Sequence, residues 1–241
     1  MMDAHTTAVA AVAEQAALPV LVPLKGVRGS IARNMTAGWQ APRVALGMEV
    51  DMRRCQLLRA RLQERAGSGV RLSVTPIVLR ALALTLRNHP AMNALMREGA
   101  IERIPGIHLN VAVALEEGLA VPVIRDADTK SIEQIAAEAA SLAAGARAGT
   151  LPLKAYQGGT FTVSSLGAAG VDWFTPILNP PQVGILGLAR VADRPVVQGG
   201  KLMIAPATTL SLVFDHRAVD GHPAALFLGE LKARLEAAEG L

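Results

Sequence analysis

Apolar and polar residues alternate along several short stretches of the chain. Between residues 43 and 52, every second residue from Val44 to Val50 is apolar, and the residues between them are small or polar. A period of two is typical of a strand with one buried face. Further strands are predicted at 158–167, 179–190 and 208–214, with hairpins at 107–124 and around Gly199 and Gly200.

Other stretches repeat their apolar residues at helical spacing. The strongly apolar segment 75–90 is predicted as a core helix that Pro76 can open and Pro90 ends. Ser131 and Gln134 have the sequence pattern of a capping box, which predicts Ser131 as the N-cap of the alanine-rich helix that follows. Helices are also predicted within 1–20 and at 27–38, 52–67 and 223–239.

The order of these elements predicts the fold class. Helices and strands are intermixed, and several strand pairs are hairpins. We therefore expect an α/β (α+β) domain in which a mixed, mostly antiparallel sheet is layered with helices. Residues 21–241 are predicted to form one domain after an N-terminal helical arm at 1–20, because no linker, repeat or low-complexity tail divides them.

Composition narrows the classes of function. About half of the 241 residues are apolar, which is enough for a substantial core. The formal net charge is +4 and aromatic residues make up 3% of the chain, a balance that does not favour a nucleic-acid-binding protein. The apolar N-terminal stretch is interrupted by Glu14 and has no basic leader, so neither a signal peptide nor a membrane span is predicted.

Cys55 is the one cysteine of the sequence. A single thiol excludes an internal disulfide and is typical of a reducing compartment, so we predict a cytoplasmic protein. Because Cys55 lies among leucines on a predicted helix, a packed thiol is favoured over a nucleophile. The five histidines match no zinc signature, so no metal site is predicted.

A charged turn follows the last predicted strand. In the segment DHRAVDG, His216 is followed by Asp220 and then by Gly221. On one interpretation His216 is a structural histidine at a strand end and Asp220 is its surface neighbour. On the other, the imidazole takes the proton of a thiol or hydroxyl, and an acyl group then transfers directly to that acceptor.

Direct acyl transfer also needs a hydrogen-bond donor for the oxyanion of the tetrahedral intermediate. Ser164 and Ser165, in the segment FTVSSLG, end a predicted strand in a turn closed by glycine. Taken alone, these serines are better explained as turn hydroxyls. No phosphate-binding loop, dinucleotide-binding turn or nucleophile elbow occurs in the sequence.

Six segments follow one another in an order and spacing that mark one enzyme family. They are RGSIARNM, MEVDM, HPAMNA, LNVAVALEEGLAVPVIRDAD, YQGGTFTVSSLGAAGVDWFTPILNPPQVGILGLAR and DHRAVDG. On these segments, the sequence from about Val22 to about Glu236 resembles the catalytic domain of dihydrolipoamide acyltransferases, the E2 components of 2-oxo-acid dehydrogenase complexes.

The resemblance implies a fold and a site. The fold is that of chloramphenicol acetyltransferase, and the active site is a channel between neighbouring subunits of a homotrimer, entered by a dihydrolipoyl arm and by coenzyme A from opposite ends. His216 matches the general base for the thiol, and Ser164 matches the hydroxyl that hydrogen-bonds the oxyanion from the facing subunit. Asp220 matches an acidic or amide residue that supports the histidine. Asp215 and Arg217 are expected to hold the turn through ion pairs.

The resemblance also implies substrates and partners. Coenzyme A is expected as a substrate, and lipoamide is expected in trans because the sequence contains no lipoyl or peripheral-subunit-binding domain. A lipoyl domain or an acyl carrier protein would present the acyl group, and E1 and E3 enzymes are further expected partners. The C-terminal segment RLEAAEGL lacks the apolar hook of cage-forming relatives, which predicts an isolated trimer.

Two alternatives to this activity stay open at the level of the sequence. The acceptor could be the phosphopantetheine thiol of an acyl carrier protein, or the chain could be a non-catalytic E2-like core scaffold. Acyl preference is open too, since Trp173, Phe174 and Pro176 either shape the acyl pocket or belong to ordinary packing. Gly221 is expected to turn the chain sharply out of the site, and His222 to start the last helix.

Overall fold

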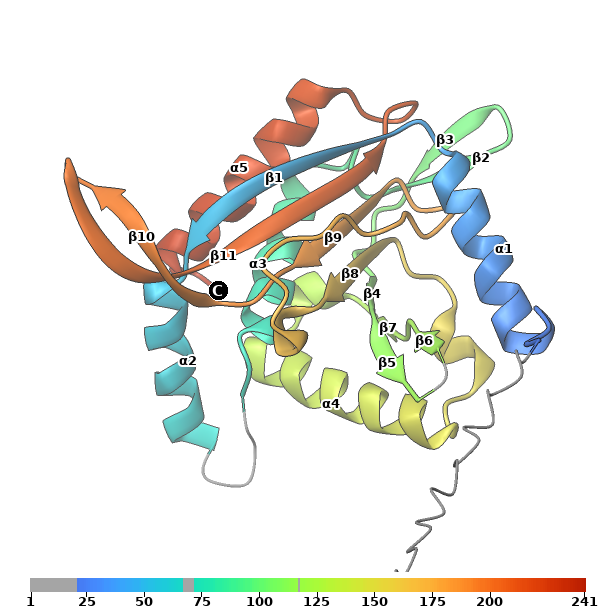
Figure 1. Cartoon of the computed structure of the whole chain (residues 1–241), viewed down its shortest axis with the longest axis horizontal. Helices are drawn as coiled ribbons and strands as arrows, with labels where there is room; N and C mark the ends of the chain where they lie inside the picture. The colour runs from blue at the N-terminus through green and yellow to red at the C-terminus, as the bar shows by residue number, and fades with distance from the viewer. Residues whose placement is uncertain (1–20, 67–71, 117) are drawn as a thin grey trace, which may run out of the picture.

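The computed structural model describes residues 21–66, 72–116 and 118–241. Within these ranges the chain forms a mixed sheet of strand order β1-β11-β9-β8-β4-β7, with β10 paired to the outer part of β11 (Figure 1). Its strands are β1 (Arg43–Asp51), β4 (Leu109–Val111), β7 (Val123–Ile124), β8 (Phe161–Ser165), β9 (Gly184–Leu188), β10 (Ala192–Gln198) and β11 (Lys201–Asp215). Two small hairpins join β2 (Ala94–Arg97) to β3 (Ala100–Arg103) and β5 (Val113–Leu115) to β6 (Gly118–Ala120). The predicted helical arm at 1–20 lies outside the described residues.

Five α-helices pack around this sheet in the described part of the chain. They are α1 (Gly26–Gln40), α2 (Arg53–Ala66), α3 (Thr75–Asn88), α4 (Ile132–Ala148) and α5 (Gly221–Ala237). α3 packs against both α4 and α5, α5 packs against β1, and α1 stands at the opposite end of the molecule from α2 (Figure 1). Among the described helices, none is both long and apolar enough to cross a bilayer.

The direction of the strands confirms the predicted fold class. β8 runs parallel to β4 and to β9, and the other neighbouring pairs of the main sheet are antiparallel. The sheet is therefore mixed and mostly antiparallel, with helices layered against it.

Both faces of the central strands are covered. The main core lies between the sheet and the helices, where the fully buried rings of Phe161 and Phe227 have centroids 6.0 Å apart. A smaller cluster on the opposite face contains Leu178, Ile185 and Val213. Because residues of a strand alternate between faces, β9 is buried along its whole length, which explains its continuous apolar run.

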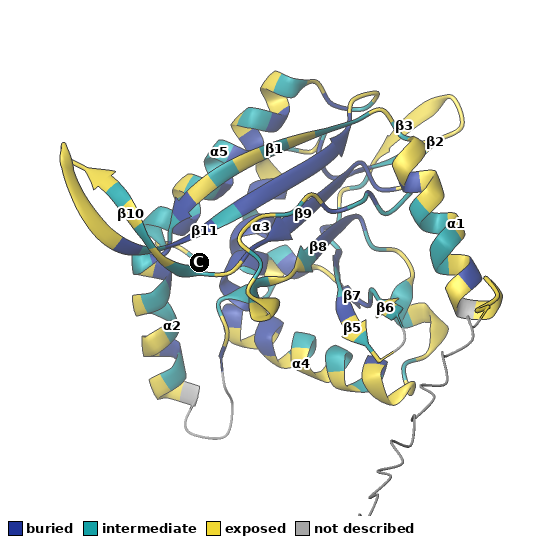
Figure 2. Cartoon of the chain, viewed as in Figure 1, coloured by how far each residue is buried: buried dark blue, intermediate teal, exposed yellow. Residues whose placement is uncertain are grey.

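The last hairpin extends further than the sequence pattern predicts. It turns at Gly199 and Gly200, as expected, with φ values of 58° and 76°. β11, however, begins at Lys201 instead of residue 208, and its outer part projects from the body with β10 (Figures 1 and 2). Val197 and Leu202 of this part are each 75% exposed. Since neither face of the projecting part meets the core, its residues lack the alternation that marks a strand.

The sequence patterns do not predict the hairpin formed by β2 and β3. All four residues of β3 are exposed, so burial imposes no alternation on them. The turn between these strands contains Gly99 at a φ of 68°, a conformation that favours glycine.

Two local predictions are confirmed. The Gln134 amide donates to Ser131 Oγ at 3.2 Å, and the Ser131 amide donates to Gln134 Oε1 at 2.8 Å, which completes the capping box of α4. Cys55 is buried on α2, and its Sγ–H donates to the Leu235 carbonyl at 3.0 Å. It is a packed thiol, as predicted.

Candidate active site

His216 lies directly after the last residue of β11. Its amide donates to the Pro42 carbonyl at 3.0 Å, and Arg43 pairs with Asp215 at the first position of β1, so the backbone on this side of the turn is fixed by the sheet. The imidazole is 45% exposed, and its ring centroid lies 6.0 Å from that of Phe214. The ring therefore rests on the core at one side and remains accessible at the other.

Asp215 and Arg217 hold the turn on both sides of His216. The Arg217 guanidinium donates from Nε to Asp215 Oδ1 at 3.0 Å and from Nη2 to Asp215 Oδ2 at 2.6 Å. Asp215 Oδ1 also accepts from the Arg217 amide at 3.0 Å. This hydrogen bonding raises the pKa of the Arg217 guanidinium. The ion pair predicted for the turn is confirmed, and it restricts the backbone around His216.

Asp220 lies close to His216 but does not hydrogen-bond to it. Its Oδ1 is 3.9 Å from His216 Nδ1, and its side chain is 84% exposed. Asp220 occupies the N-cap position of α5 without a side-chain capping bond. Within a single chain, water reaches both groups.

Gly221 and His222 begin α5. His222 lies in the first turn of the helix, as expected. Gly221 does not have a positive φ, and a side chain at its position would meet open space. The expectation that this glycine permits a sharp turn is therefore wrong for the single chain, because an ordinary helical start already redirects the backbone.

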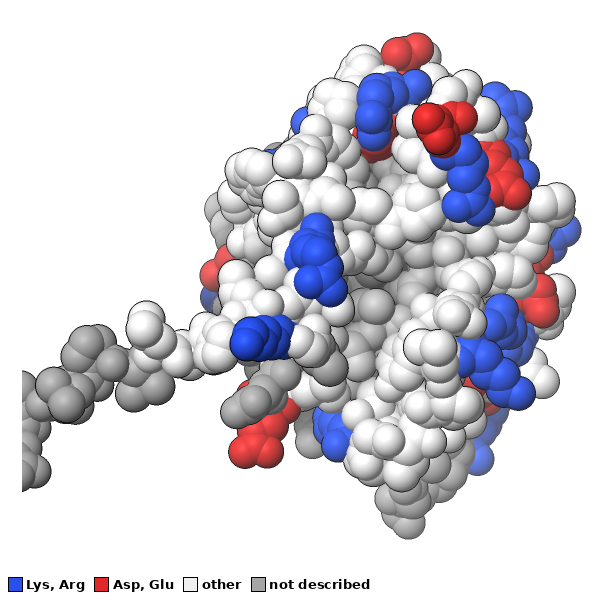
Figure 3. Space-filling view, turned by 90° about the vertical axis from the view of Figure 1, so that its right-hand side faces the viewer, with Lys and Arg blue, Asp and Glu red and all other residues white. Residues whose placement is uncertain are grey.

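Ser164 lies near the end of β8 and faces a pocket of about 380 Å³. The pocket is enclosed by α1, by Ala112, Leu119 and Val121, by β8, by residues 174–179 and by β9, and most of its lining is apolar. Figure 3 shows the face of the molecule that carries α1, which is hollowed at its centre and mostly uncharged there. In the described part of the chain, the Ser164 hydroxyl has no hydrogen-bond partner, whereas Ser165 is exposed and does not line the pocket.

A single chain does not bring Ser164 and His216 together. In the sheet, Ser164 is in register with Gly187, and Gly187 is in register with Ser211. His216 lies five residues beyond Ser211, which corresponds to about 17 Å along the strand direction. One acyl group cannot contact both side chains of the same copy.

Two of the three residues considered for the acyl pocket, Phe174 and Pro176, line this pocket. Both lie against Gly187, where a Cβ atom added to the glycine would be 3.1 Å from each of them. Trp173 lies outside the lining and is 59% exposed. Sequence reasoning missed the polar lining residues Asn34, Thr162 and Asn179. For Thr162, the sequence did contain a signal. A hydroxyl residue two positions before Ser164 on the same strand shares the face of Ser164.

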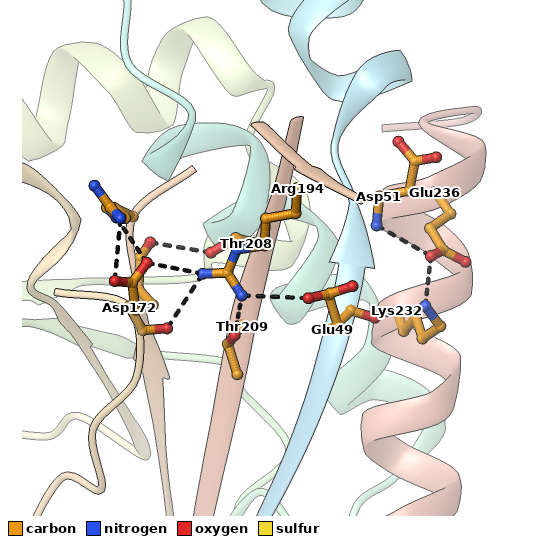
Figure 4. A network of polar contacts seen from close by, with 10 residues as sticks. Glu49, Asp51, Asp172, Arg194, Thr208, Thr209, Lys232 and Glu236 are labelled. Carbon is orange, nitrogen blue, oxygen red and sulfur yellow. Dashed lines mark hydrogen bonds and ion pairs between the residues drawn. The ribbon is translucent and has the colours of Figure 1, made fainter. Parts of the chain in front are cut away.

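An ion-pair network anchors the segment that follows the serine turn. Arg194 donates to Asp172 Oδ1 at 3.2 Å, to Glu49 Oε2 at 3.2 Å and to Thr209 Oγ1 at 3.1 Å (Figure 4). Arg190 Nε donates to Asp172 Oδ1 at 2.7 Å, and this hydrogen bond lowers the pKa of the Asp172 carboxyl. The start of the segment that supplies Phe174 is thereby tied to three strands of the sheet.

A larger hollow of about 710 Å³ lies beside the projecting hairpin. It is lined mainly by charged residues, among them Asp51, Lys232 and Glu236, which Figure 4 shows linked to one another. None of the candidate catalytic residues lines it. We therefore place the candidate chemistry at the apolar pocket and at the His216 turn.

Comparison with known proteins identifies the family. The sequence model of the 2-oxoacid dehydrogenases acyltransferase (catalytic domain) family matches residues 18–241. The dihydrolipoyllysine-residue acetyltransferase component of the acetoin cleaving system of Bacillus subtilis is 41% identical over 218 residues, which cover 89% of this chain and 55% of that protein. The chain spans about half the length of the curated relatives that it matches.

Solved structures of the same kind superpose closely. The cubic core of the pyruvate dehydrogenase multienzyme complex has a TM-score of 0.88 at 36% identity, covering 95% of this chain and 96% of that one. The dihydrolipoamide acetyltransferase of Azotobacter vinelandii has a TM-score of 0.86 at 36% identity, covering 92% and 93%. Crystallographic and enzymatic work on the latter concerns the catalytic roles of a serine, a histidine 52 residues later and an asparagine four residues after that.

A more distant likeness concerns the fold. A chloramphenicol acetyltransferase has a TM-score of 0.54 at 15% identity, covering 84% of this chain and 94% of that one, and it confirms the predicted fold. The match of the family model over residues 18–241, together with the 41% identity, shows that this chain belongs to the acyltransferase catalytic domains of the 2-oxoacid dehydrogenases.

Proposed function

We propose that this domain transfers an acyl group between dihydrolipoamide and coenzyme A, with His216 as the general base and Ser164 as the oxyanion donor. The observation that carries the proposal is the spacing of these residues. Ser164 and His216 are 52 residues apart, and Asp220 follows four residues later, which is the spacing of the serine, histidine and asparagine in the Azotobacter vinelandii enzyme.

The accessible imidazole suits the first half of the reaction. His216 takes the proton from the thiol of coenzyme A, and the sulfur attacks the carbonyl carbon of the acyl-dihydrolipoamide thioester. A new C–S bond forms, and the carbonyl oxygen becomes an oxyanion. When this intermediate collapses, the C–S bond to dihydrolipoamide breaks, and the proton on His216 passes to the departing sulfur.

The unpartnered hydroxyl of Ser164 suits the second requirement. Its O–H donates to the oxyanion, which has a full charge only in the intermediate and its flanking transition states. An apolar pocket around this hydroxyl strengthens the hydrogen bond, because little water competes for it.

We further propose that the active unit is a homotrimer. The register of the sheet separates Ser164 and His216 of one copy by about 17 Å, so a working site needs Ser164 of one copy and His216 of another. Asp220 then supports the orientation of His216 from the side of Nδ1, where it already lies at 3.9 Å. A lipoyl domain as acyl carrier, E1 and E3 as partners and a cytoplasmic location complete the proposal.

Replacement of His216 tests the proposed reaction. Acyl transfer from acetyl-dihydrolipoamide to coenzyme A is measured for the wild type and for His216→Ala. We expect a loss of at least about a hundredfold in kcat, which is the usual contribution of a general base. His222→Ala, at the exposed start of α5, is the matched control and is expected to keep full activity. Equal rates for the wild type and His216→Ala would contradict the proposal.

A further inference from the structure

A chain of amide and hydroxyl side chains lies against the Ser164 pocket. We call it the amide relay, and it consists of Asn34, Asn179, Thr162, Gln182 and Asn110. Asn34 Nδ2 donates to Asn179 Oδ1 at 2.9 Å, and Asn179 Nδ2 donates to Thr162 Oγ1 at 3.2 Å. The Thr162 hydroxyl donates to Gln182 Oε1, and Gln182 Nε2 donates to Asn110 Oδ1 at 2.6 Å.

Two backbone carbonyls fix the direction of every hydrogen bond in the relay. Asn110 Nδ2 donates to the Val121 carbonyl at 2.7 Å, and Gln182 Nε2 donates to the Gly159 carbonyl at 2.9 Å. A carbonyl only accepts, so both amide nitrogens must face these carbonyls, and Gln182 Oε1 must accept from Thr162. Thr162 has a single hydroxyl proton, which leaves its oxygen as an acceptor for Asn179.

The inner members of the relay are closed to water. Thr162 and Asn110 are each 2% exposed, and Gln182 is 5% exposed. A Cβ added at Gly159 would lie 1.6 Å from Asn110 Oδ1, so the backbone approaches the relay closely. A buried polar group without a hydrogen-bond partner destabilises the folded state. Loss of one member of the relay therefore leaves its neighbours without a partner.

The relay joins the elements that enclose the pocket. Asn34 belongs to α1, Asn179 and Gln182 belong to the segment after Phe174, and Thr162 belongs to β8. Asn34, Thr162 and Asn179 themselves line the pocket. Thr162 precedes Ser164 by two residues on the same strand, so the two side chains share one face.

We propose that the amide relay positions Ser164, and that Thr162 is the positioning residue through which it acts. The inference rests on the proposed role of Ser164 as oxyanion donor. An oxyanion donor is effective when its place is set before the reaction begins, since no free energy is then spent on reorienting it. The Ser164 hydroxyl has no hydrogen bond to any residue that the structure describes, whereas the Thr162 hydroxyl both donates and accepts one.

Removal of the Thr162 hydroxyl tests this role. Thr162→Val keeps the shape of the side chain and breaks both hydrogen bonds. We expect kcat for acetyl transfer to fall at least about tenfold, with both KM values within about twofold of wild type, because the Ser164 hydrogen bond is made in the transition state. Thr162→Ser restores the hydroxyl and is expected to retain kcat within about twofold.

A double-mutant cycle separates positioning from general weakening. In a Ser164→Ala background, Thr162→Val is expected to cause no further loss of kcat, because its effect passes through the missing hydroxyl. Thr208→Val is the matched control. Thr208 is fully buried on β11 and donates one hydrogen bond to the Ala189 carbonyl at 3.0 Å, away from the pocket lining. It is expected to keep the wild-type kcat.

Wild-type kcat for Thr162→Val, an equal loss for Thr208→Val, or an undiminished loss in the Ser164→Ala background would each overturn the relay. If Thr162→Val does not fold, Asn34→Ala is tested in its place, at the half-buried end of the relay. It is expected to lower kcat about threefold in the wild type and to have no effect on kcat in the Ser164→Ala background. If the His216→Ala variant is active, the proposed function itself is wrong. If His216→Ala is inactive while Thr162→Val is fully active, only the relay is wrong.

Discussion

The residues of the His216 turn have separate tasks. Asp215 and Arg217 pair with each other across two hydrogen bonds, and the amide of His216 is held by Pro42. Among the described residues the imidazole has no strong partner, because the carboxylate that approaches it, on Asp220, stays 3.9 Å away. The turn is therefore fixed in its backbone and open at the imidazole that we propose as the base.

The thiol of Cys55 is expected to be inert in the folded protein. Burial raises the pKa of this thiol to about 12, so almost no thiolate is present near neutral pH. We expect Cys55 to react with a disulfide reagent only after denaturation, and the measurement is the time course of thiol labelling in buffer and in guanidinium chloride. Rapid labelling in buffer would contradict the packing of α2 against α5.

Single residues of the candidate site differ in how far the sequence predicts them. His216, Asp220 and Ser164 were predicted because their segments, together with four others, match those of one family in order and spacing. Asn34 and Asn179 were missed because they are 145 residues apart and become neighbours only when α1 packs on the segment before β9. No local sequence pattern predicts a contact between residues so far apart in the chain.

At the scale of elements, the capping box of α4 has a measurable contribution. Ser131→Ala removes the side-chain bond to the Gln134 amide and is expected to lower the free energy of unfolding by about 1 kcal/mol. Ser141→Ala, on the exposed surface of the same helix, is the control. It is not expected to lower the free energy of unfolding, because alanine has a higher helix propensity than serine. The free energy of unfolding is measured by chemical denaturation of the wild type and both variants. An equal decrease for the two variants would contradict a stabilising role of the cap.

The junction of β1 and α2 is expected to respond to pH. Hydrogen bonds from the Arg53 side chain lower the pKa of Asp51 below its ordinary value of 3.8. A carboxyl with a lowered pKa in the folded state stabilises the fold above its unfolded pKa, and this contribution is lost as the pH falls through the folded value. Asp51→Asn should therefore lower the midpoint of thermal unfolding at about pH 7, and the difference should become smaller as the pH is lowered to about 3.

Asp193→Asn, on the exposed surface of β10, controls for the removal of one negative charge. The two substitutions are compared by calorimetry at both pH values. An Asp51→Asn difference that does not shrink in acid would show that the Arg53 interaction is not its cause.

Elements were predicted best where burial marks one face. β1, α3 and α4 follow their sequence patterns closely, because each packs one face or side on the core. β3 and the outer part of β11 were missed for the opposite reason, since their residues are exposed on both faces. Hairpin geometry forms these segments, and it depends on turns such as Gly99 more than on hydrophobic alternation.

At the scale of the whole molecule, one copy keeps the two residues of the proposed site apart. The sheet holds Ser164 in a pocket on one side and His216 at a distant strand end, about 17 Å further along the strands. This separation follows from strand register, which no sequence pattern of a single segment determines. The family resemblance predicts a site shared between subunits, and the register is the physical reason why we propose it.

The central claim is that each active site combines Ser164 of one copy with His216 of another. Its most direct test is to refold equal amounts of Ser164→Ala and His216→Ala chains together and to isolate the mixed assemblies by two different affinity tags. Light scattering checks that each particle contains about three chains. Each variant refolded alone is the control and is expected to be almost inactive.

Every trimer that contains both variants has one shared site of its three with both residues intact, so the isolated mixed assemblies are predicted to recover roughly a third of the wild-type acyl transfer rate. If both residues acted from the same chain, every site would lack one of them. Mixed assemblies with no more activity than the two variants alone would contradict the account.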